Sequence, residues 1–280
     1  MANYLKTTVL LAAMTALLLI FGIGLVGPEG IWLAPASAFG INAYVYWQGP
    51  GLVLAAHVAV EFDRGAALDL IDLVHNIART AGIPAPRLFI SDNPQPNAFA
   101  IGRGHRDAAI VLTTQLLQIL TKEEFAGVLG HELAHIRSRD TLTMTISATI
   151  VGAIAAIGTL VFLVGRLTRG GKELSIVLMA LLAPLAAAIL QLMLSRSREY
   201  AADKAGAAIC GHPEWLASAL SKLSEAARQA NNPIALRHPA TASLHIVDPL
   251  QDISWACLFT THPPIERRIA GLNQMRTSWA

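Results

Sequence analysis

The sequence predicts a mostly α-helical membrane protein that also contains a smaller, polar α+β part. Of its 280 residues, 54% are hydrophobic and only 14% are charged, whereas an ordinary soluble domain has roughly 25% charged residues. The formal net charge is +2, so the chain lacks the high net charge that is typical of disordered proteins. It also lacks a long basic tract of the kind that binds nucleic acid, so no nucleic-acid partner is expected.

Four nearly uncharged segments are the candidate membrane helices. They cover residues 7–27, 31–48, 141–165 and 174–194. Each is close to the roughly 20 residues that a helix needs to cross a bilayer. A signal peptide cleaved near Ala36–Ser37–Ala38 is the alternative for the first segment, but the apolar stretch is longer than a signal core, which favours an uncleaved helix. Gly49–Pro50 interrupts the second segment, and residues 51–60 are either a frayed continuation or an interfacial piece.

A polar segment, residues 61–140, is predicted to begin with a helix and to continue as a small antiparallel sheet. Apolar residues recur at helical spacing from Leu68 to Ile77, and Gly82–Ile83–Pro84 ends this helix. Turn-forming residues separate three short apolar segments that follow it. These candidate strands cover residues 87–91, 98–101 and 108–112.

The next predicted helix carries the candidate chemistry. Thr121 and Glu124 have the spacing of a capping box, so a helix is expected to begin there and to run past Leu133. His131 and His135 are four residues apart, on one face of this helix, where both imidazoles can bind the same metal ion. Glu132 lies about 100° around the helix from His131, where it can reach a water at the metal.

A hydrolytic zinc site needs a third protein ligand and keeps one position open. Glu199 is the candidate, because it opens the first polar helix after the fourth apolar segment, and Asp203 lies one turn further on. Asp203 would then accept the spare N–H of a ligand imidazole. The alternative is that both carboxylates are solvated and paired with Arg196, Arg198 or Lys204. The His pair favours the metal-binding interpretation.

Four motifs, in this order along the chain, resemble those of the HtpX family of membrane-bound zinc metallopeptidases, which are related to the prenyl-protein endopeptidases of the endoplasmic reticulum. The motifs are Pro96–Asn97–Ala98–Phe99–Ala100, His131–Glu132–Leu133–Ala134–His135, Ser197–Arg198–Glu199–Tyr200–Ala201–Ala202–Asp203, and Thr261–His262–Pro263–Pro264 with Arg268. The resemblance covers essentially the whole chain.

The resemblance implies a zincin-like α+β catalytic domain of the gluzincin type, with one Zn²⁺ per chain. The zinc ligands that it implies are His131, His135 and Glu199. It implies Glu132 as the general base, and it places His262 and Arg268 near the substrate carbonyl. Without the resemblance, the alternative is that His262 is an ordinary His in a turn and Arg268 an ordinary surface Arg.

The candidate substrate-binding residues are Asn97, Ala98 and Phe99, on a strand that we expect at a sheet edge near the zinc. An extended peptide could pair with this edge through its main chain, with little sequence preference. Asn97 could instead contact the substrate backbone directly. The alternative is a buried central strand with Phe99 in the core.

The predicted organisation alternates membrane and catalytic parts. N-terminal membrane helices occupy residues 1–60, the first part of the catalytic domain 61–140, a membrane helical hairpin 141–194, and the second part of the catalytic domain 195–280. The short distance from His135 to Thr141 indicates one continuous helix from the site to the membrane.

The resemblance implies a multi-pass protein of the bacterial cytoplasmic membrane, with its active site facing the cytoplasm. However, residues 49–60 contain no Lys or Arg, so the positive-inside signal is missing there. The basic loop with Arg166, Arg169 and Lys172 would lie opposite the site if all four segments spanned the bilayer. A hairpin that enters the bilayer only partly is the alternative.

The predicted function is zinc-dependent hydrolysis of peptide bonds in misfolded or damaged membrane proteins, with protein or peptide substrates and the lipid bilayer as partners. Protein quality control and stress response follow from the resemblance alone. An intramembrane-cleaving protease is an alternative, although charged residues at 122–124 and 137–140 flank the His motif. A non-catalytic zinc-binding membrane scaffold is another; it would be expected to place ionisable residues inside its apolar segments.

Overall fold

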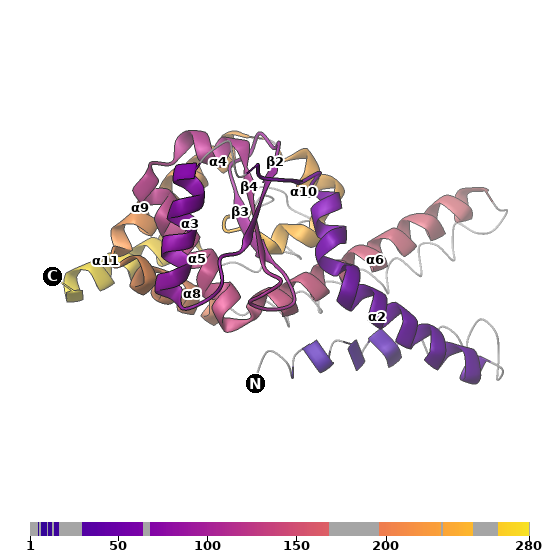
Figure 1. Cartoon of the computed structure of the whole chain (residues 1–280). Coiled ribbons are helices and arrows are strands. Elements are labelled where there is room, and N and C mark those ends of the chain that lie inside the picture. Colours follow the sequence, from indigo (N-terminus) through magenta and orange to yellow (C-terminus); the bar gives the residue numbers. More distant parts are fainter. Residues whose placement is uncertain are drawn as a thin grey trace.

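Two long helices project from one side of a body that contains a small sheet and the shorter helices (Figure 1). The structure is a computed structural model of the whole chain. It describes residues 5, 7–9, 11–12, 14–16, 30–63, 68–167, 196–230, 232–248 and 263–279. The long helices are α2 (Gly30–Ala56) and α6 (Asp140–Leu167). The described part is mostly helical with one small sheet, which confirms that part of the predicted fold class.

Four strands form one mixed sheet in the order β1-β2-β4-β3. They are β1 (Val60–Glu61), β2 (Arg87–Ser91), β3 (Ala98–Ile101) and β4 (Ala109–Thr113). β1 pairs antiparallel with β2, and β3 with β4, but β2 and β4 are parallel. The predicted antiparallel sheet is therefore wrong at its centre. β3 folds back onto the outer side of β4, which leaves the inner side of β4 to pair with β2 in the same direction.

The remaining helices surround this sheet. They are α3 (Leu68–Ala81), α4 (Thr114–Ile119), α5 (Lys122–Ser138), α8 (Arg196–Cys210), α9 (Pro213–Gln229), α10 (Pro233–Arg237), the 3₁₀ helix η2 (Pro239–Leu244) and α11 (Ile265–Trp279). The predicted helix from Leu68 is confirmed as α3. The predicted start of α5 is also confirmed: the Thr121 hydroxyl accepts from the Glu124 N–H at 3.3 Å, and the Glu124 carboxylate accepts from the Thr121 N–H at 2.9 Å.

The two faces of the sheet are buried against different helices, because successive side chains of a strand point to opposite sides. Leu88 and Ile110 belong to a core shared with α3, α5, α8 and α9. Phe99 and Val111 belong to a second core shared with α2 and α6. The later part of α2 and the first half of α6 therefore pack against this face of the sheet.

α5 and α6 are two helices, so the continuous helix expected between His135 and Thr141 is wrong. Arg139 has a φ of +60°, the left-handed conformation that ends α5, and α6 begins at Asp140. This conformation is uncommon for a residue other than glycine. The Asp140 carboxylate fixes the turn, because it accepts hydrogen bonds from Ser138 Oγ at 2.7 Å and from His135 Nδ1 at 3.2 Å.

α2 and α6 contain the second and third predicted membrane segments, residues 31–48 and 141–165. α2 continues through Pro50 to Ala56, so residues 51–56 extend the helix. Within the described residues, no helix is both long enough and apolar enough to cross a membrane. The segment 174–194 and much of 7–27 lie outside the described residues.

Candidate metal centre

Three potential metal ligands from two helices converge at one point. His131 and His135 lie on successive turns of α5, and Glu199 lies in the first turn of α8. The two Nε2 atoms are 3.2 Å apart, and the Glu199 carboxylate oxygens lie 3.8 Å from His131 Nε2 and 3.5 Å from His135 Nε2. Ligand atoms bound at 2.0–2.1 Å to a tetrahedral zinc ion are about 3.3 Å apart. The spacing therefore fits a zinc ion, and all three residues are at most 3% exposed.

Asp203 lies where it orients the first of these imidazoles. Its Oδ1 atom is 2.9 Å from His131 Nδ1, so the Nδ1–H donates to Asp203 and Nε2 is directed at the metal position. Burial lowers the pKa of His131 to about 4, which keeps the ring neutral, as a metal ligand must be. Burial alone would raise the pKa of Asp203, but the Arg268 charge and hydrogen bonds lower it to about 2. Asp203 is thus a carboxylate at neutral pH.

Asp140 orients the second imidazole in the same way, and sequence reasoning missed it. Its Oδ2 atom accepts from His135 Nδ1, and Arg198 Nη1 lies 3.3 Å from its other oxygen. Although burial opposes ionisation, His135 and Arg198 lower the pKa of Asp140 to about 2. The available signal was an acidic residue at the start of an otherwise uncharged segment, five residues after a candidate ligand.

Arg268 from α11 is buried behind the metal ligands. Its guanidinium donates to both Asp203 carboxylate oxygens, at 2.8 and 2.7 Å, and to the Ile246 carbonyl at 2.8 Å. It also lies 3.8 Å from a Glu199 oxygen. Arg268 therefore joins α11 to α8 and to the chain after η2. Its predicted position near a substrate carbonyl stays a prediction, and His262 lies outside the described residues.

Glu132 is buried beside the same centre, on α5 between the two imidazoles in sequence. Burial, with a contribution from Glu199, raises the pKa of its carboxyl to about 7, and the nearby His135 and a hydrogen bond with the Ala100 backbone work against this rise. A cation bound at the centre would lower this pKa by stabilising the carboxylate. Without a cation, the carboxyl of Glu132 therefore holds a proton more readily than an exposed Glu does.

The candidate substrate strand is an edge strand, as predicted, but its edge is occupied. β3 is last in the sheet order, while Phe99 lies in the core, as the alternative expected. The Asn97 carbonyl accepts a hydrogen bond from the Thr113 N–H of β4. Because the backbone groups of successive strand residues point to opposite sides, those of Ala98 point away from β4. The Ala98 carbonyl accepts from Ile246 N–H at 3.0 Å, and Asn97 Nδ2 donates to the Val247 carbonyl at 2.8 Å. The chain's own residues 246–247 cover the place where a peptide would pair.

An open cleft reaches the back of the metal centre at Arg268. It has about 750 Å³ of empty space and is lined by Arg196, Arg228, Ile246, Val247, Asp248 and residues 263–266 with Arg268. Because the metal ligands are buried, this cleft does not expose them directly. Residues 246–247 line both this cleft and the edge of β3.

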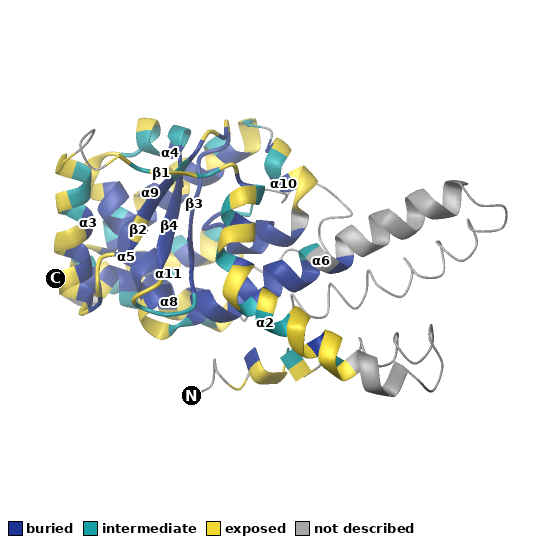
Figure 2. Cartoon of the chain, turned by 45° about the vertical axis from the view of Figure 1, so that its right-hand side comes forward, coloured by how far each residue is buried: buried dark blue, intermediate teal, exposed yellow. Residues whose placement is uncertain are grey.

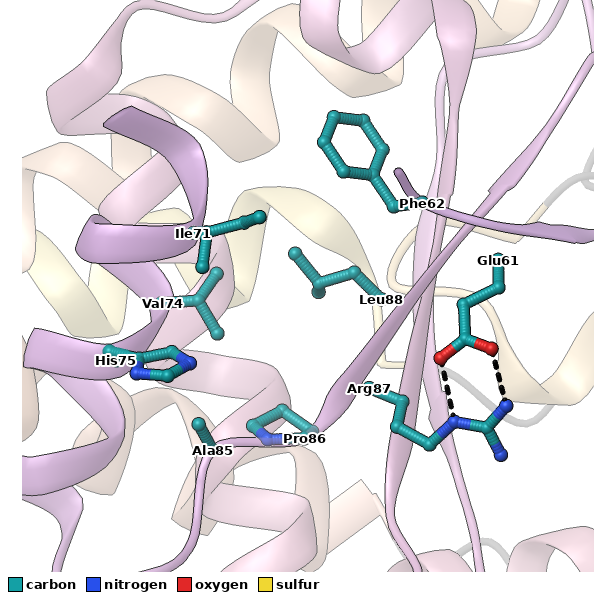
Figure 3. Close-up of a pocket in the computed structure, with 9 residues that line it drawn as sticks. All are labelled: Glu61, Phe62, Ile71, Val74, His75, Ala85, Pro86, Arg87 and Leu88. Atoms are coloured by element: carbon teal, nitrogen blue, oxygen red, sulfur yellow. Dashed lines mark hydrogen bonds and ion pairs between the residues drawn. The ribbon is translucent and has the colours of Figure 1, made fainter. Parts of the chain in front are cut away.

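A second pocket lies at the opposite edge of the sheet, beside β1 and α3 (Figure 3). It has about 460 Å³ of empty space between apolar side chains that include Ile71, Val74 and Leu88. At its rim Arg87 and Glu61 form two hydrogen bonds, at 2.9 and 2.6 Å. Since β1 and β3 are opposite edges of the sheet, this pocket is not part of the metal centre.

Comparison with known proteins agrees with this arrangement. One similar solved structure is the crystal structure of S. mikatae Ste24p, with a TM-score of 0.53 and 18% sequence identity. The match covers 97% of this chain and 66% of that chain, slightly less than two thirds of its length, and at this identity it shows a shared fold. Residues 66–276 match peptidase family M48. This range exceeds half of the chain and contains the candidate ligands from both helices, so the protein belongs to peptidase family M48, a family of zinc metallopeptidases.

Proposed function

We propose that this protein is a membrane-bound zinc endopeptidase that hydrolyses peptide bonds in misfolded or damaged membrane proteins. The observation that carries the proposal is the convergence of His131, His135 and Glu199 beside the buried carboxyl of Glu132. A zinc ion held by these ligands would supply a Lewis acid for the substrate carbonyl and for the attacking water.

The chain's own residues would provide the proton transfers and the orientation. Glu132 would accept a proton from the attacking water and then deliver it to the leaving amine, a role that suits a buried carboxylate beside the metal position. Asp203 and Asp140 would hold the two imidazoles with Nε2 toward the metal. The resemblance supports His262 and Arg268 as the groups that stabilise the oxyanion of the tetrahedral intermediate.

Attachment to a bilayer is supported by the exposed surface of α2 (Figure 2). Phe39 is 77% exposed, Tyr44 55% and Trp47 62%. Several large exposed aromatic side chains on one helix are typical of membrane or protein interaction sites. The uncharged segments of the sequence and the family resemblance support the same location. The bacterial cytoplasmic membrane and a site that faces the cytoplasm are parts of the proposal that follow from the resemblance.

The test compares the purified full chain in detergent with a Glu132→Gln variant. We expect the wild type to contain one zinc ion per chain and to cleave casein or a detergent-solubilised membrane protein. Loss of a general base typically slows a reaction by 10²–10⁴-fold, so Glu132→Gln should be slower by at least about a hundred-fold while its zinc content is unchanged. Metal analysis and cleavage assays on the same preparations separate the two effects.

Two outcomes would contradict the proposal. Equal cleavage by both proteins would exclude Glu132 as the general base. Zinc bound by both proteins without any cleavage of either substrate would instead favour the non-catalytic scaffold.

A further inference from the structure

A basic pocket lies where the two long helices join the catalytic body. It is lined by Tyr46 of α2, by the β3–β4 loop residues Arg103, Gly104, His105, Arg106 and Asp107, and by Arg139 between α5 and α6. It is open to one side, with about 900 Å³ of empty space. Its lining contains three guanidinium groups and one carboxylate, so the pocket carries excess positive charge. We call this set of residues the basic pocket.

The loop that supplies most of the basic pocket is held in place. Gly102 has a φ of +137°, and a Cβ at this position would lie 2.4 Å from the Asp107 carbonyl oxygen, so the turn requires glycine. The Gly102 N–H donates to Thr145 Oγ1 of α6 at 3.3 Å. His105 Nε2 lies 3.1 Å from the Arg137 carbonyl oxygen at the end of α5. The loop is thus anchored on both helices that meet at Arg139.

The lining of the basic pocket has more guanidinium groups than carboxylates. Arg103 pairs with Asp107, and its guanidinium lies over the Tyr46 ring at 5.9 Å from the ring centre. Arg106 is exposed at the rim, and Arg139 is half-buried. Guanidinium groups bind phosphate oxygens with planar, two-point geometry, which makes an arginine pocket well suited to a phosphate group.

The surroundings of the pocket indicate where that phosphate comes from. Trp47 of α2 is exposed next to Tyr46, and Phe39, about two turns before Tyr46 on the same side of the helix, extends the exposed apolar surface toward the far end of α2. Tyr and Trp are enriched at the level of lipid headgroups, with apolar residues further into the bilayer. Basic pockets between helices at that level bind anionic headgroups.

We propose that the basic pocket binds the phosphate headgroup of an anionic phospholipid whose acyl chains lie along the exposed face of α2. This inference rests on the membrane attachment in the proposed function, but not on its chemistry. It also gives α2 the cationic partner that its own sequence lacks, because residues 49–60 contain no Lys or Arg. The positive charge is supplied in space by the β3–β4 loop and by the α5–α6 junction.

The test measures lipid binding by the full chain in a neutral detergent. Dioleoyl phosphatidylglycerol, dioleoyl phosphatidylcholine and inorganic phosphate are added separately, and binding is followed by native mass spectrometry and by the melting temperature. The variant is Arg106→Gln with Arg139→Asn, since asparagine tolerates the left-handed backbone at Arg139. The matched control is Arg79→Gln with Arg276→Gln, which removes two exposed charges from α3 and α11, on the side of the body away from α2 (Figure 1).

We expect phosphatidylglycerol to bind and stabilise the wild type and the control, and phosphatidylcholine and phosphate to bind far more weakly. The pocket variant should bind phosphatidylglycerol about thirty-fold more weakly, since each basic side chain near an anionic surface contributes about five-fold in affinity. Equal phosphatidylglycerol binding by the variant and the wild type would overturn the proposal. Equal binding of the two lipids, or phosphate binding as tight as phosphatidylglycerol, would overturn it as well.

The same preparations separate this inference from the proposed function. Casein cleavage in detergent needs the metal centre and not the basic pocket. Cleavage without selective lipid binding would therefore count against the lipid site alone, and selective lipid binding without cleavage would count against the peptidase alone.

Discussion

Gly206 of α8 lies directly against the backbone of His131 on α5. A Cβ at Gly206 would lie 2.6 Å from the His131 nitrogen, and a Cβ at Gly130 would lie 2.8 Å from the Gly206 carbonyl oxygen. Real Cβ atoms do not approach other atoms this closely, so the two helices can cross at this distance only through glycine. Because Glu199 lies about two turns earlier on α8, this crossing sets its distance from the two imidazoles.

Gly206→Ala should therefore weaken metal binding without changing any ligand. The added methyl group must push α8 away from α5, which overpacks the contact and separates Glu199 from the His pair. Overpacking in a close contact typically costs 1–3 kcal/mol, so we expect a lower melting temperature and zinc affinity lower by roughly ten-fold or more. Zinc affinity is measured by competition with a chromogenic chelator, and stability by thermal unfolding.

Gly271→Ala is the matched control, because Gly271 is also helical but a Cβ there meets nothing within 4 Å. It should leave zinc affinity unchanged and raise stability slightly, since alanine is favoured over glycine in helices by up to about 1 kcal/mol. Wild-type zinc affinity in Gly206→Ala would show that the helix crossing does not control the site.

Asp140→Asn should lower the affinity of the protein for zinc. The amide keeps the size of the side chain but removes the charge that orients the His135 Nδ1–H and faces Arg198. Loss of such a supporting carboxylate typically lowers metal affinity by 10–100-fold. Chelator competition measures the change, with Asp69→Asn, an exposed carboxylate on α3, as the control. An unchanged affinity would mean that His135 is oriented by other contacts.

Asn97→Ala should release residues 246–247 from the edge of β3. The Asn97 amide donates to the Val247 carbonyl and accepts from the Ile246 N–H, so its removal leaves buried backbone groups without these bonds. Such losses cost about 1–3 kcal/mol each. We expect amide hydrogen exchange in residues 245–248 to accelerate by roughly ten-fold or more.

A bound substrate should cause the same change if it pairs with β3. In the inactive Glu132→Gln protein, a saturating peptide should accelerate exchange at 246–247 and slow it on the outward side of β3. The control for Asn97→Ala is Asn93→Ala, which removes a separate buried hydrogen bond to Asn232 and so reports the effect of a general loss of stability. Slower exchange at 246–247 with peptide bound would mean that the substrate does not displace this segment.

Local patterns in the sequence predicted the parts of the site that lie close together along the chain. The capping box at Thr121 and the helical spacing of His131 and His135 are local features, and the structure has both. The pairing of β2 with β4 and the coverage of Ala98 by Ile246 depend on contacts between distant segments, which residue spacing does not encode. For the same reason, sequence reasoning treated Asp140 as one more flanking charge.

The positive charge near α2 shows the same limit of sequence reasoning. Residues 49–60 contain no Lys or Arg, yet the fold brings Arg103 over Tyr46. The positive-inside rule counts residues close to a membrane segment in sequence. Here a loop between two strands brings positive charge close to α2, and only the tertiary structure reveals it.

His57 links the end of α2 to η2, and it is a buried titratable group outside the metal centre. Its Nε2 atom lies 2.9 Å from Thr241 Oγ1, and its ring packs against Phe99 and His245 at ring-centre distances of 4.7 and 5.2 Å. Burial, with a smaller contribution from the charge of His238, lowers the pKa of His57 to about 4. The folded protein therefore holds this ring neutral at pH values where an unfolded chain would protonate it.

The contribution of His57 to stability should decrease as the pH falls from about 6.5 to about 4. Over this range the unfolded chain binds more protons at His57 than the folded chain, so unfolding becomes more favourable, by at most about 3 kcal/mol for a shift from 6.5 to 4. His57→Gln cannot take up this proton, so its unfolding free energy should depend less on pH than that of the wild type, whatever its stability at pH 7. Urea unfolding in detergent with a chelator at pH 4–8 measures the difference, and His75→Gln, an exposed His on α3, is the control. Parallel pH curves for His57→Gln and the wild type would show that His57 is not held neutral by the fold.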